Sequence, residues 1–341
     1  MFRFELVPLK ECQEVALAFR NANRPLQRTH EYFSWRYLAR PCAEAPVVAW
    51  AWHGESPAGA VTIAPHDFAI YGQMVRLGIL GDVSIAPQHR GSGLGVSLLE
   101  FVAKSMMGIG MHCIVLPNAA AQKALRKARW EAVCKVDRYV RPILPVGSER
   151  AGVRISLARR ALSRVVSAGL RTIDAAAAVV ARDAVLAAED GDQNELASLW
   201  RRTELANTCL SVRTPEYIRW RYLDHPLQRY DFLALRSPGE LLGYAIVHLE
   251  GPTLVVDDYL LSGREFGTTF CLKLIDWARS RSLFDIQMRT SNTLHWGIPW
   301  RWLGFIPRND AIEVMGSPGL ASAIHLKDHR DWFLTAGDKD V

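Results

Sequence analysis

Residues 88 to 95 hold closely spaced glycines in a pattern that suits the binding of an anion. They read Gln-His-Arg-Gly-Ser-Gly-Leu-Gly. Glycine lacks a Cβ, so the backbone at Gly91, Gly93 and Gly95 can close on a phosphate group. The segment is therefore predicted to be a phosphate-binding loop.

The flanking residues predict the two elements that position this loop. Val83-Ser84-Ile85-Ala86 is apolar and β-branched, as in a strand that ends at Pro87. After the glycines, apolar residues recur at helical spacing, at Leu94, Leu98, Leu99, Val102 and Met106. The first amides of that helix have no partner within it, and the helix dipole adds partial positive charge there.

Two known phosphate loops are excluded by the spacing. A Walker loop ends in Gly-Lys-Ser/Thr, whereas this one ends Gly93-Leu94-Gly95. A dinucleotide fingerprint needs glycine where Gln88 stands. What remains is Gln88-x-x-Gly91-x-Gly93 with Arg90, preceded by Val83-x-Ile85-x-Pro87. This pattern resembles the acyl-CoA pyrophosphate loop of the GNAT (GCN5-related N-acetyltransferase) superfamily, and an ordinary strand-to-helix turn is the alternative.

The resemblance implies acetyl-CoA or another acyl-CoA as donor and needs no metal. Amides around Val83 to Ile85 would hold the thioester carbonyl, and Arg90 with the loop would hold the pyrophosphate. Pro117-Asn118 and Trp130 also fit positions typical of GNAT domains, but Leu125 stands where many relatives carry a tyrosine that protonates the leaving thiolate. The residues assigned to the cofactor are Val83, Ser84, Ile85, Gln88, His89, Arg90, Gly91, Ser92, Gly93, Leu94, Gly95 and Asn118.

An internal repeat predicts two domains. Thr29–Pro41 and Thr214–Pro226 share Thr, Glu, Tyr, Trp, Arg, Tyr, Leu and Pro in place, which is too many for chance. The expected fold is α/β, with two tandem GNAT-like domains that each have a central mixed β-sheet flanked by helices. We expect an N-terminal GNAT domain at 1–145, a basic helical connector at 146–190 and a degenerate GNAT-like domain at 191–341. In the second copy Thr269 and Cys271 replace the later loop glycines, so its CoA site is expected to be weakened or lost.

The composition narrows the class of protein and its expected location. The chain has 341 residues, 49% of them hydrophobic, and six scattered cysteines without metal-ligand spacing. No signal-peptide core or bilayer-spanning run is present, so a cytoplasmic location is expected.

Between the copies, residues 150–182 hold seven arginines against one aspartate. This basic helix could contact an anionic membrane surface or pack on a domain as a connector; without interleaved aromatic residues, nucleic-acid binding is not expected.

Asp82 is the candidate catalytic residue. An amine must lose a proton before it attacks a thioester, and Asp82 is the titratable side chain on the strand before the loop. Pairing with a backbone amide or an arginine is its alternative role.

The candidate acceptor-binding residues are Tyr32, Trp35 and Arg36, since aromatic faces and an arginine suit a sugar or an anion. The same residues recur in the second copy, so domain packing is the alternative.

The predicted function is transfer of an acyl group, favouring acetyl, to a primary amine on a small-molecule acceptor. A narrower resemblance to GNAT-like proteins of bacterial cell-surface polysaccharide synthesis suggests an amino sugar or nucleotide sugar. Acylation of a peptide or protein, or a non-catalytic acyl-CoA-responsive scaffold, are the alternatives. The sequence leaves the oligomeric state open.

Overall fold

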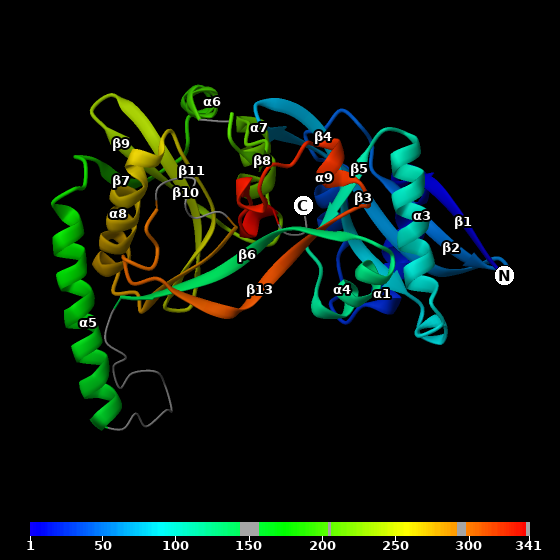
Figure 1. Ribbon diagram of the computed structural model, residues 1–341, viewed down its shortest axis with the longest axis horizontal. Helices are drawn as coiled ribbons and strands as arrows, with labels where there is room; N and C mark the ends of the chain where they lie inside the picture. The colour runs from blue at the N-terminus through cyan, green and yellow to red at the C-terminus, as the bar shows by residue number, and fades with distance from the viewer. Residues whose placement is uncertain (144–156, 204–205, 292–297, 339–341) are drawn as a thin grey trace.

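The computed structural model describes residues 1–143, 157–203, 206–291 and 298–338 (Figure 1). A mixed β-sheet runs through the whole chain, in the order β1-β2-β3-β4-β5-β13-β6-β12-β11-β10-β9-β7, with helices against it. The expected α/β architecture is confirmed. The described helices include none that is long and apolar enough to cross a membrane.

The first half builds one end of the sheet. Its strands are β1 (Phe2–Pro8), β2 (Val47–His53), β3 (Ser56–Ile70), β4 (Gln73–Ile85), β5 (His112–Val115) and β6 (Glu131–Pro142). Its helices are α1 (Leu9–Asn23), α2 (His30–Tyr37), α3 (Leu94–Gly108) and α4 (Ala119–Lys127). The apolar face predicted for α3 is buried, from Leu94 to Met106, and it packs into a cluster with β2, β3 and β5.

The second half has a similar order of strands and helices, with additional elements. It comprises α5 (Leu157–Ala178), β7 (Val185–Glu189), α6 (Gln193–Arg202), β8 (Cys209–Ser211), α7 (Pro215–Ile218), β9 (Asp231–Ser237), β10 (Glu240–Glu250), β11 (Thr253–Leu261), α8 (Gly267–Ser280), β12 (Asp285–Thr290), β13 (Ile306–Gly316), α9 (Leu320–Ala323) and β14 (Trp332–Phe333). A π-helical turn at Arg219–Leu223 extends α7. Strand β7 falls inside the range expected to be connector, so the second set of strands begins before residue 191.

The last strands of the two halves are exchanged. Strand β13 of the second half lies between β5 and β6, and β6 of the first half pairs on its other side with β12. The two exchanged strands also pair with each other in the middle of the sheet (Figure 1). Each half therefore completes the sheet of the other, an arrangement that the contiguous boundaries expected at 145 and 191 do not describe.

The repeated sequence motif forms equivalent helices in the two halves. Thr29 caps α2 by accepting from the amide of Tyr32, and Thr214 caps α7 by accepting from the amide of Tyr217. A threonine at the N-cap satisfies an amide that has no partner inside the helix. The shared threonine thus has one structural role in both copies.

Candidate functional site

Strands β4 and β5 separate part-way along their length. They are paired in parallel only from Leu77–His112 to Ile79–Ile114, while β4 continues to Ile85. At this point β4 contains a bulge, since Asp82 and Val83 together oppose the single residue Val61 of β3. Asp82 has φ +48°, a left-handed conformation that bends the strand. The bulge and the separation open one edge of β4 to a ligand.

The predicted phosphate loop lies at the head of α3, directly after β4. Gly91 and Gly93 have φ of +79° and +87°, which only glycine adopts at low cost. The backbone amides of residues 91 to 95 donate to no acceptor within the described part of the chain, whereas those of Val96 and Ser97 both donate to the Gly93 carbonyl. Five consecutive free amides at a helix N-terminus form an anion-binding cradle.

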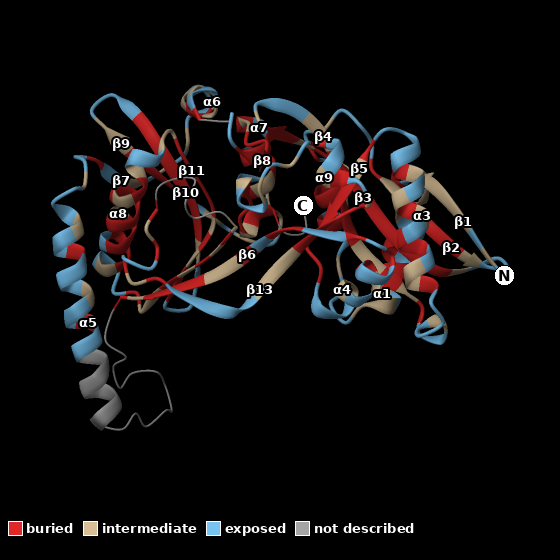
Figure 2. Ribbon diagram, in the orientation of Figure 1, coloured by how far each residue is buried: buried red, intermediate tan, exposed pale blue. Residues whose placement is uncertain are grey.

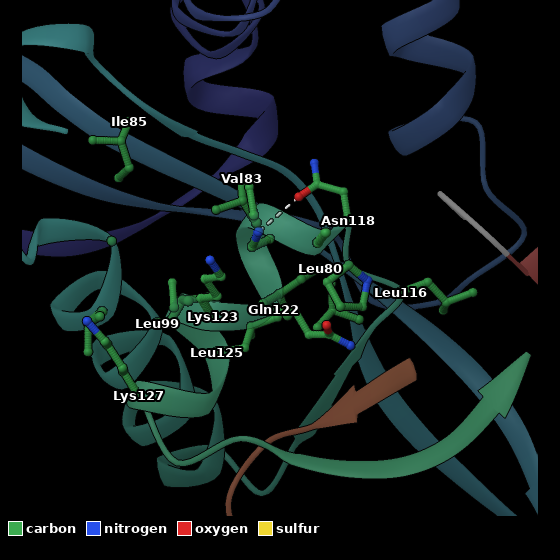
Figure 3. A pocket seen from close by; sticks show the side chains of 18 of the residues that line it. Leu80, Val83, Ile85, Leu99, Leu116, Asn118, Gln122, Lys123, Leu125 and Lys127 are labelled. Atoms are coloured by element: carbon green, nitrogen blue, oxygen red, sulfur yellow. Dashed lines mark hydrogen bonds between the residues drawn. The ribbon is translucent and has the colours of Figure 1, made fainter. Parts of the chain in front are cut away.

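A cavity of about 1160 Å³ joins this cradle to the separated strands. Figure 3 shows Leu80, Leu116 and Leu125 around it, together with polar side chains of α4. The opposite wall comes from residues 309 to 313 of β13 in the second half, where residues 309 to 311 bulge out of the pairing with β6. The first half therefore supplies the loop and floor of the site, and the exchanged strand supplies a wall.

The predicted cofactor residues divide into two groups. The structure brings Val83, Ile85, His89, Arg90, Gly91, Gly93, Gly95 and Asn118 together in the lining of this cavity. The others do not line it: Leu94 and Ser84 are buried, Gln88 is exposed, and the Ser92 hydroxyl donates to the His89 carbonyl. The Arg90 guanidinium donates to the carbonyls of Ile85 and Asn23, which ties the loop to β4 and to the end of α1. Asn118 caps α4 by accepting from the Ala121 amide (Figure 3).

Asp82 is held in a buried charge cluster beneath the bulge. Its two carboxylate oxygens accept from Arg20 Nε at 2.9 Å and from the Tyr37 hydroxyl at 2.8 Å, and Arg36 lies 3.6 Å away. Burial raises the pKa of Asp82, but Arg36, Arg20 and Tyr37 together outweigh burial, so the pKa is lowered overall. A carboxylate with a lowered pKa is a weak base, and these contacts favour the alternative role in which Asp82 fixes the bulge.

The second half has an equivalent aspartate–arginine pair, but it lacks the later glycines of the loop. Asp258, which aligns with Asp82, is fully buried and accepts from Arg213 at 3.0 Å. At the head of α8 the Thr269 hydroxyl accepts from the backbone amide of Arg182 at 2.8 Å. Thr269 and Cys271 are fully buried. The segment around Arg182 thus lies against the head of α8. The aspartate–arginine pair occurs in both halves, although their loops differ.

We expect Asp82→Asn to destabilise the protein by about 3 kcal/mol at neutral pH, because it removes the negative charge that Arg20 and Arg36 face in a buried site. The folded-state pKa of Asp82 lies below the unfolded value near 3.9. Its stabilising contribution is therefore complete above that value and is lost as the pH falls through the folded pKa. Urea unfolding at neutral and acidic pH should show the difference between variant and wild type shrinking in acid. Unchanged stability with a lower rate and a shifted pH–rate profile would instead assign Asp82 to proton transfer.

The predicted acceptor residues lie at the contact between the halves. Tyr32, Trp35 and Arg36 are buried and do not line the cavity. The Trp35 ring stacks on that of Trp220 at 5.4 Å, and each indole N–H donates to the other residue's carbonyl at 2.8 Å. Because Trp35 and Trp220 are equivalent positions of the repeated motif, the two copies meet through the same residue. These contacts favour the packing alternative.

Sequence reasoning missed several residues that line the cavity. Arg24, at the end of α1, donates to the Val83 carbonyl at 2.6 Å and to the Ser84 hydroxyl at 3.3 Å. Lys123 and Lys127 lie four residues apart on α4 and both line the cavity (Figure 3). The helical spacing could have revealed the two lysines once α4 was assigned. Nothing in the sequence links Arg24 or residues 309 to 313 to the loop.

The structure combines a mixed sheet flanked by helices with a glycine loop at the head of a helix, as the GNAT resemblance predicted. Residues 10–129 match the model of the Acetyltransferase (GNAT) family, so the first half contains a GNAT acetyltransferase domain. No curated protein matches the chain significantly by sequence.

Solved structures extend the likeness to both halves. A probable N-acyltransferase of Enterococcus faecalis is similar with a TM-score of 0.64 and 12% identity, covering 93% of this chain and 72% of that one. A GCN5-related N-acetyltransferase of Anabaena variabilis has a TM-score of 0.62 and 15% identity, covering 92% and 72%. The Saccharomyces cerevisiae N-myristoyltransferase with bound myristoyl-CoA has a TM-score of 0.56 and 13% identity, covering 92% and 78%. The GNAT-type fold therefore covers most of the chain.

Proposed function

We propose that the protein transfers an acyl group, favouring acetyl, from acyl-CoA to a primary amine, and that the site in the first half performs the reaction. The observation that carries the proposal is the run of five free amides at the head of α3, opening into the cavity beside the β4 bulge. The pyrophosphate of CoA would lie on the amides of residues 91 to 95. Its pantetheine arm would follow β4 where β5 has separated, which brings the thioester to Val83.

In the reaction, the neutral amine nitrogen attacks the thioester carbonyl carbon, and the carbon–sulfur bond breaks. Backbone amides around Val83 to Ile85 would hold the oxyanion, and the proton of the attacking nitrogen passes to water. None of the described lining residues is Tyr, Ser, Thr or Cys. We therefore propose direct transfer to the amine, with a thiolate that can leave without a tyrosine acid because the thiol pKa is near 8.5.

Lys123 and Lys127 are proposed to bind phosphate groups of CoA, because both are exposed cations at the cavity. The double variant Lys123→Glu with Lys127→Glu should weaken acyl-CoA binding by roughly tenfold or more, since two charge-assisted hydrogen bonds are replaced by repulsion. Isothermal titration of wild type and variant with acetyl-CoA measures this. Lys104→Glu is the matched control, because Lys104 is exposed on α3 and does not line the cavity. Equal affinity in the double variant and the control would exclude the two lysines from the site.

The acceptor class is tested by CoA release from acetyl-CoA with a panel of amines. We propose amino sugars and nucleotide sugars as the first acceptors to try, following the likeness to surface-polysaccharide proteins. Release with peptide N-termini alone would favour the peptide alternative, whose support is the fold shared with an N-myristoyltransferase. Tight CoA binding without turnover on any acceptor would favour the scaffold.

A further inference from the structure

Helix α5 contacts the protein body through one side, which holds a buried charge cluster. Asp174 is buried and its carboxylate accepts from Arg141 at 2.6 Å and also from Arg279 of α8. Ser167 is buried on the same side of the helix, and Leu170 lies against Gly304. The α5 helix is therefore anchored to the second half by a buried charge cluster, with Leu170 and Ala177 making apolar contacts beside it.

The apolar side chains of this region face solvent instead. Val165 is 69% exposed, and Val166 and Ile173 are also exposed. In the turn that follows α5, Val179 and Val180 are 84% and 72% exposed. Val165, Val166 and Ile173 are therefore exposed apolar residues of α5, and Val179 and Val180 continue this exposed apolar surface just beyond the end of the helix. We call these five residues the α5 outer face; Figure 2 shows the described part of α5 as mostly exposed.

An exposed tryptophan lies close to the same helix. Trp302 is 82% exposed, and Gly304, two residues later, contacts α5 at Leu170. Tryptophan has an apolar ring and one polar N–H, a combination that favours the boundary between lipid and water. Exposed apolar residues on a helix, together with an exposed tryptophan in a segment that contacts the same helix, are unusual for a surface in contact with water alone.

Charge indicates what covers this surface. Residues 150–182 contain seven arginines, and their one acid, Asp174, is already paired with Arg141 and Arg279. The formal net charge of the whole chain is +6, so this segment carries as much net charge as the entire protein. Arg171 is exposed on α5, between the buried side and the outer face. A basic helix with an apolar outer face matches the chemistry of an anionic bilayer, where apolar side chains enter the headgroup region and arginines contact lipid phosphates.

We propose that the α5 outer face and Trp302 dock the protein on the surface of a membrane that contains anionic lipids. Docking places the apolar residues in the interface and leaves the cavity beside α3 in water, since α5 packs at the far end of the second half (Figure 1). The proposed docking surface is separate from the acyl-CoA cavity, so its test does not depend on the proposed transfer reaction.

The test is flotation of the full-length protein with phosphatidylcholine vesicles that contain or lack phosphatidylglycerol. We expect binding only to the anionic vesicles and release at high salt. The double variant Val166→Asp with Ile173→Asp, and separately Trp302→Ala, should weaken binding at least tenfold. Acetyl-CoA affinity should stay unchanged in both, which shows that the variants are folded. Met74→Asp is the matched control, because Met74 is 60% exposed on β4, in the other half.

Three outcomes would overturn the proposal. They are no binding to anionic vesicles, binding that the α5 and Trp302 variants leave unchanged, and equal binding to neutral vesicles. Sedimentation equilibrium of the same proteins addresses a second copy of the chain as the occupant. A dimer in wild type that the double variant abolishes, without vesicle binding, would assign the surface to self-association instead.

Discussion

Replacing Gly93 with arginine should abolish acyl-CoA binding while the protein remains folded. Gly93 has φ +87°, and a Cβ there would meet no atom within 4 Å, so the free protein has room for a side chain. That room is the space above the free amides in which we place the pyrophosphate. An arginine would fill it, and we expect affinity to fall at least about a hundredfold because several hydrogen bonds to charged phosphate are lost together. Isothermal titration with acetyl-CoA measures the loss.

Gly110 offers a control with the same backbone problem and no role in the site. It has φ +78°, a Cβ there would also meet no atom within 4 Å, and it lies beyond the opposite end of α3. Gly110→Arg should therefore share the left-handed strain, about 1–2 kcal/mol, and keep full affinity. Thermal unfolding of both variants checks that their stabilities are similar. Wild-type affinity in Gly93→Arg would remove the loop from the binding site.

The sequence predicted the loop and its elements because each signal there is local. The apolar spacing of Leu94 to Met106 requires a helix with one buried face, and Pro87 with the glycines requires a turn. The side chains that the structure places in the core match that spacing. Which loop residues line the cavity was less predictable. Ser84 and Leu94 point into the protein because the bulge at Asp82 and the first turn of α3 set their direction.

The strand exchange could not be predicted from pattern. An alternating strand such as β6 has the same sequence signature in either sheet, so the periodicity of Glu131–Pro142 does not say which neighbour it pairs with. The wall formed by residues 309 to 313 follows from that exchange. It lies more than two hundred residues from the loop it faces, and no spacing rule connects segments so far apart.

The apolar stripe of the connector helix shows a different limit of prediction from sequence. In the sequence, Val165 and Val166 belong to an apolar stripe of this basic helix, which was expected either to pack on a domain or to contact an anionic membrane surface. The structure turns this side outward because Asp174 bonds Arg141 and Arg279 on the opposite side. The buried ion-pair cluster lies on the packed side of α5, and an amphipathic pattern alone cannot say which side of a helix faces the protein.

Trp35→Ala should produce the largest loss of stability, because Trp35 joins the two halves. The substitution removes a buried indole, its stacking on Trp220, and one of two reciprocal hydrogen bonds, and it leaves the Trp220 carbonyl without its donor. We expect a loss of about 3–5 kcal/mol in the free energy of unfolding, as for other buried aromatic residues that are replaced by alanine. Urea denaturation gives the value. Trp302→Ala, at an exposed tryptophan, should change stability by less than about 0.5 kcal/mol.

A double-mutant cycle separates domain packing from acceptor binding. Trp220→Ala should cost about as much as Trp35→Ala, and the double variant should cost clearly less than their sum, because the residues contact each other and share both hydrogen bonds. If Trp35 instead bound the acceptor, Trp35→Ala would raise KM for the amine and leave unfolding unchanged, while Trp220→Ala would do neither. Coupling between equivalent residues of the repeated motif would show that the motif persists in both halves because each copy is the other's packing partner, whether or not its own loop can hold CoA.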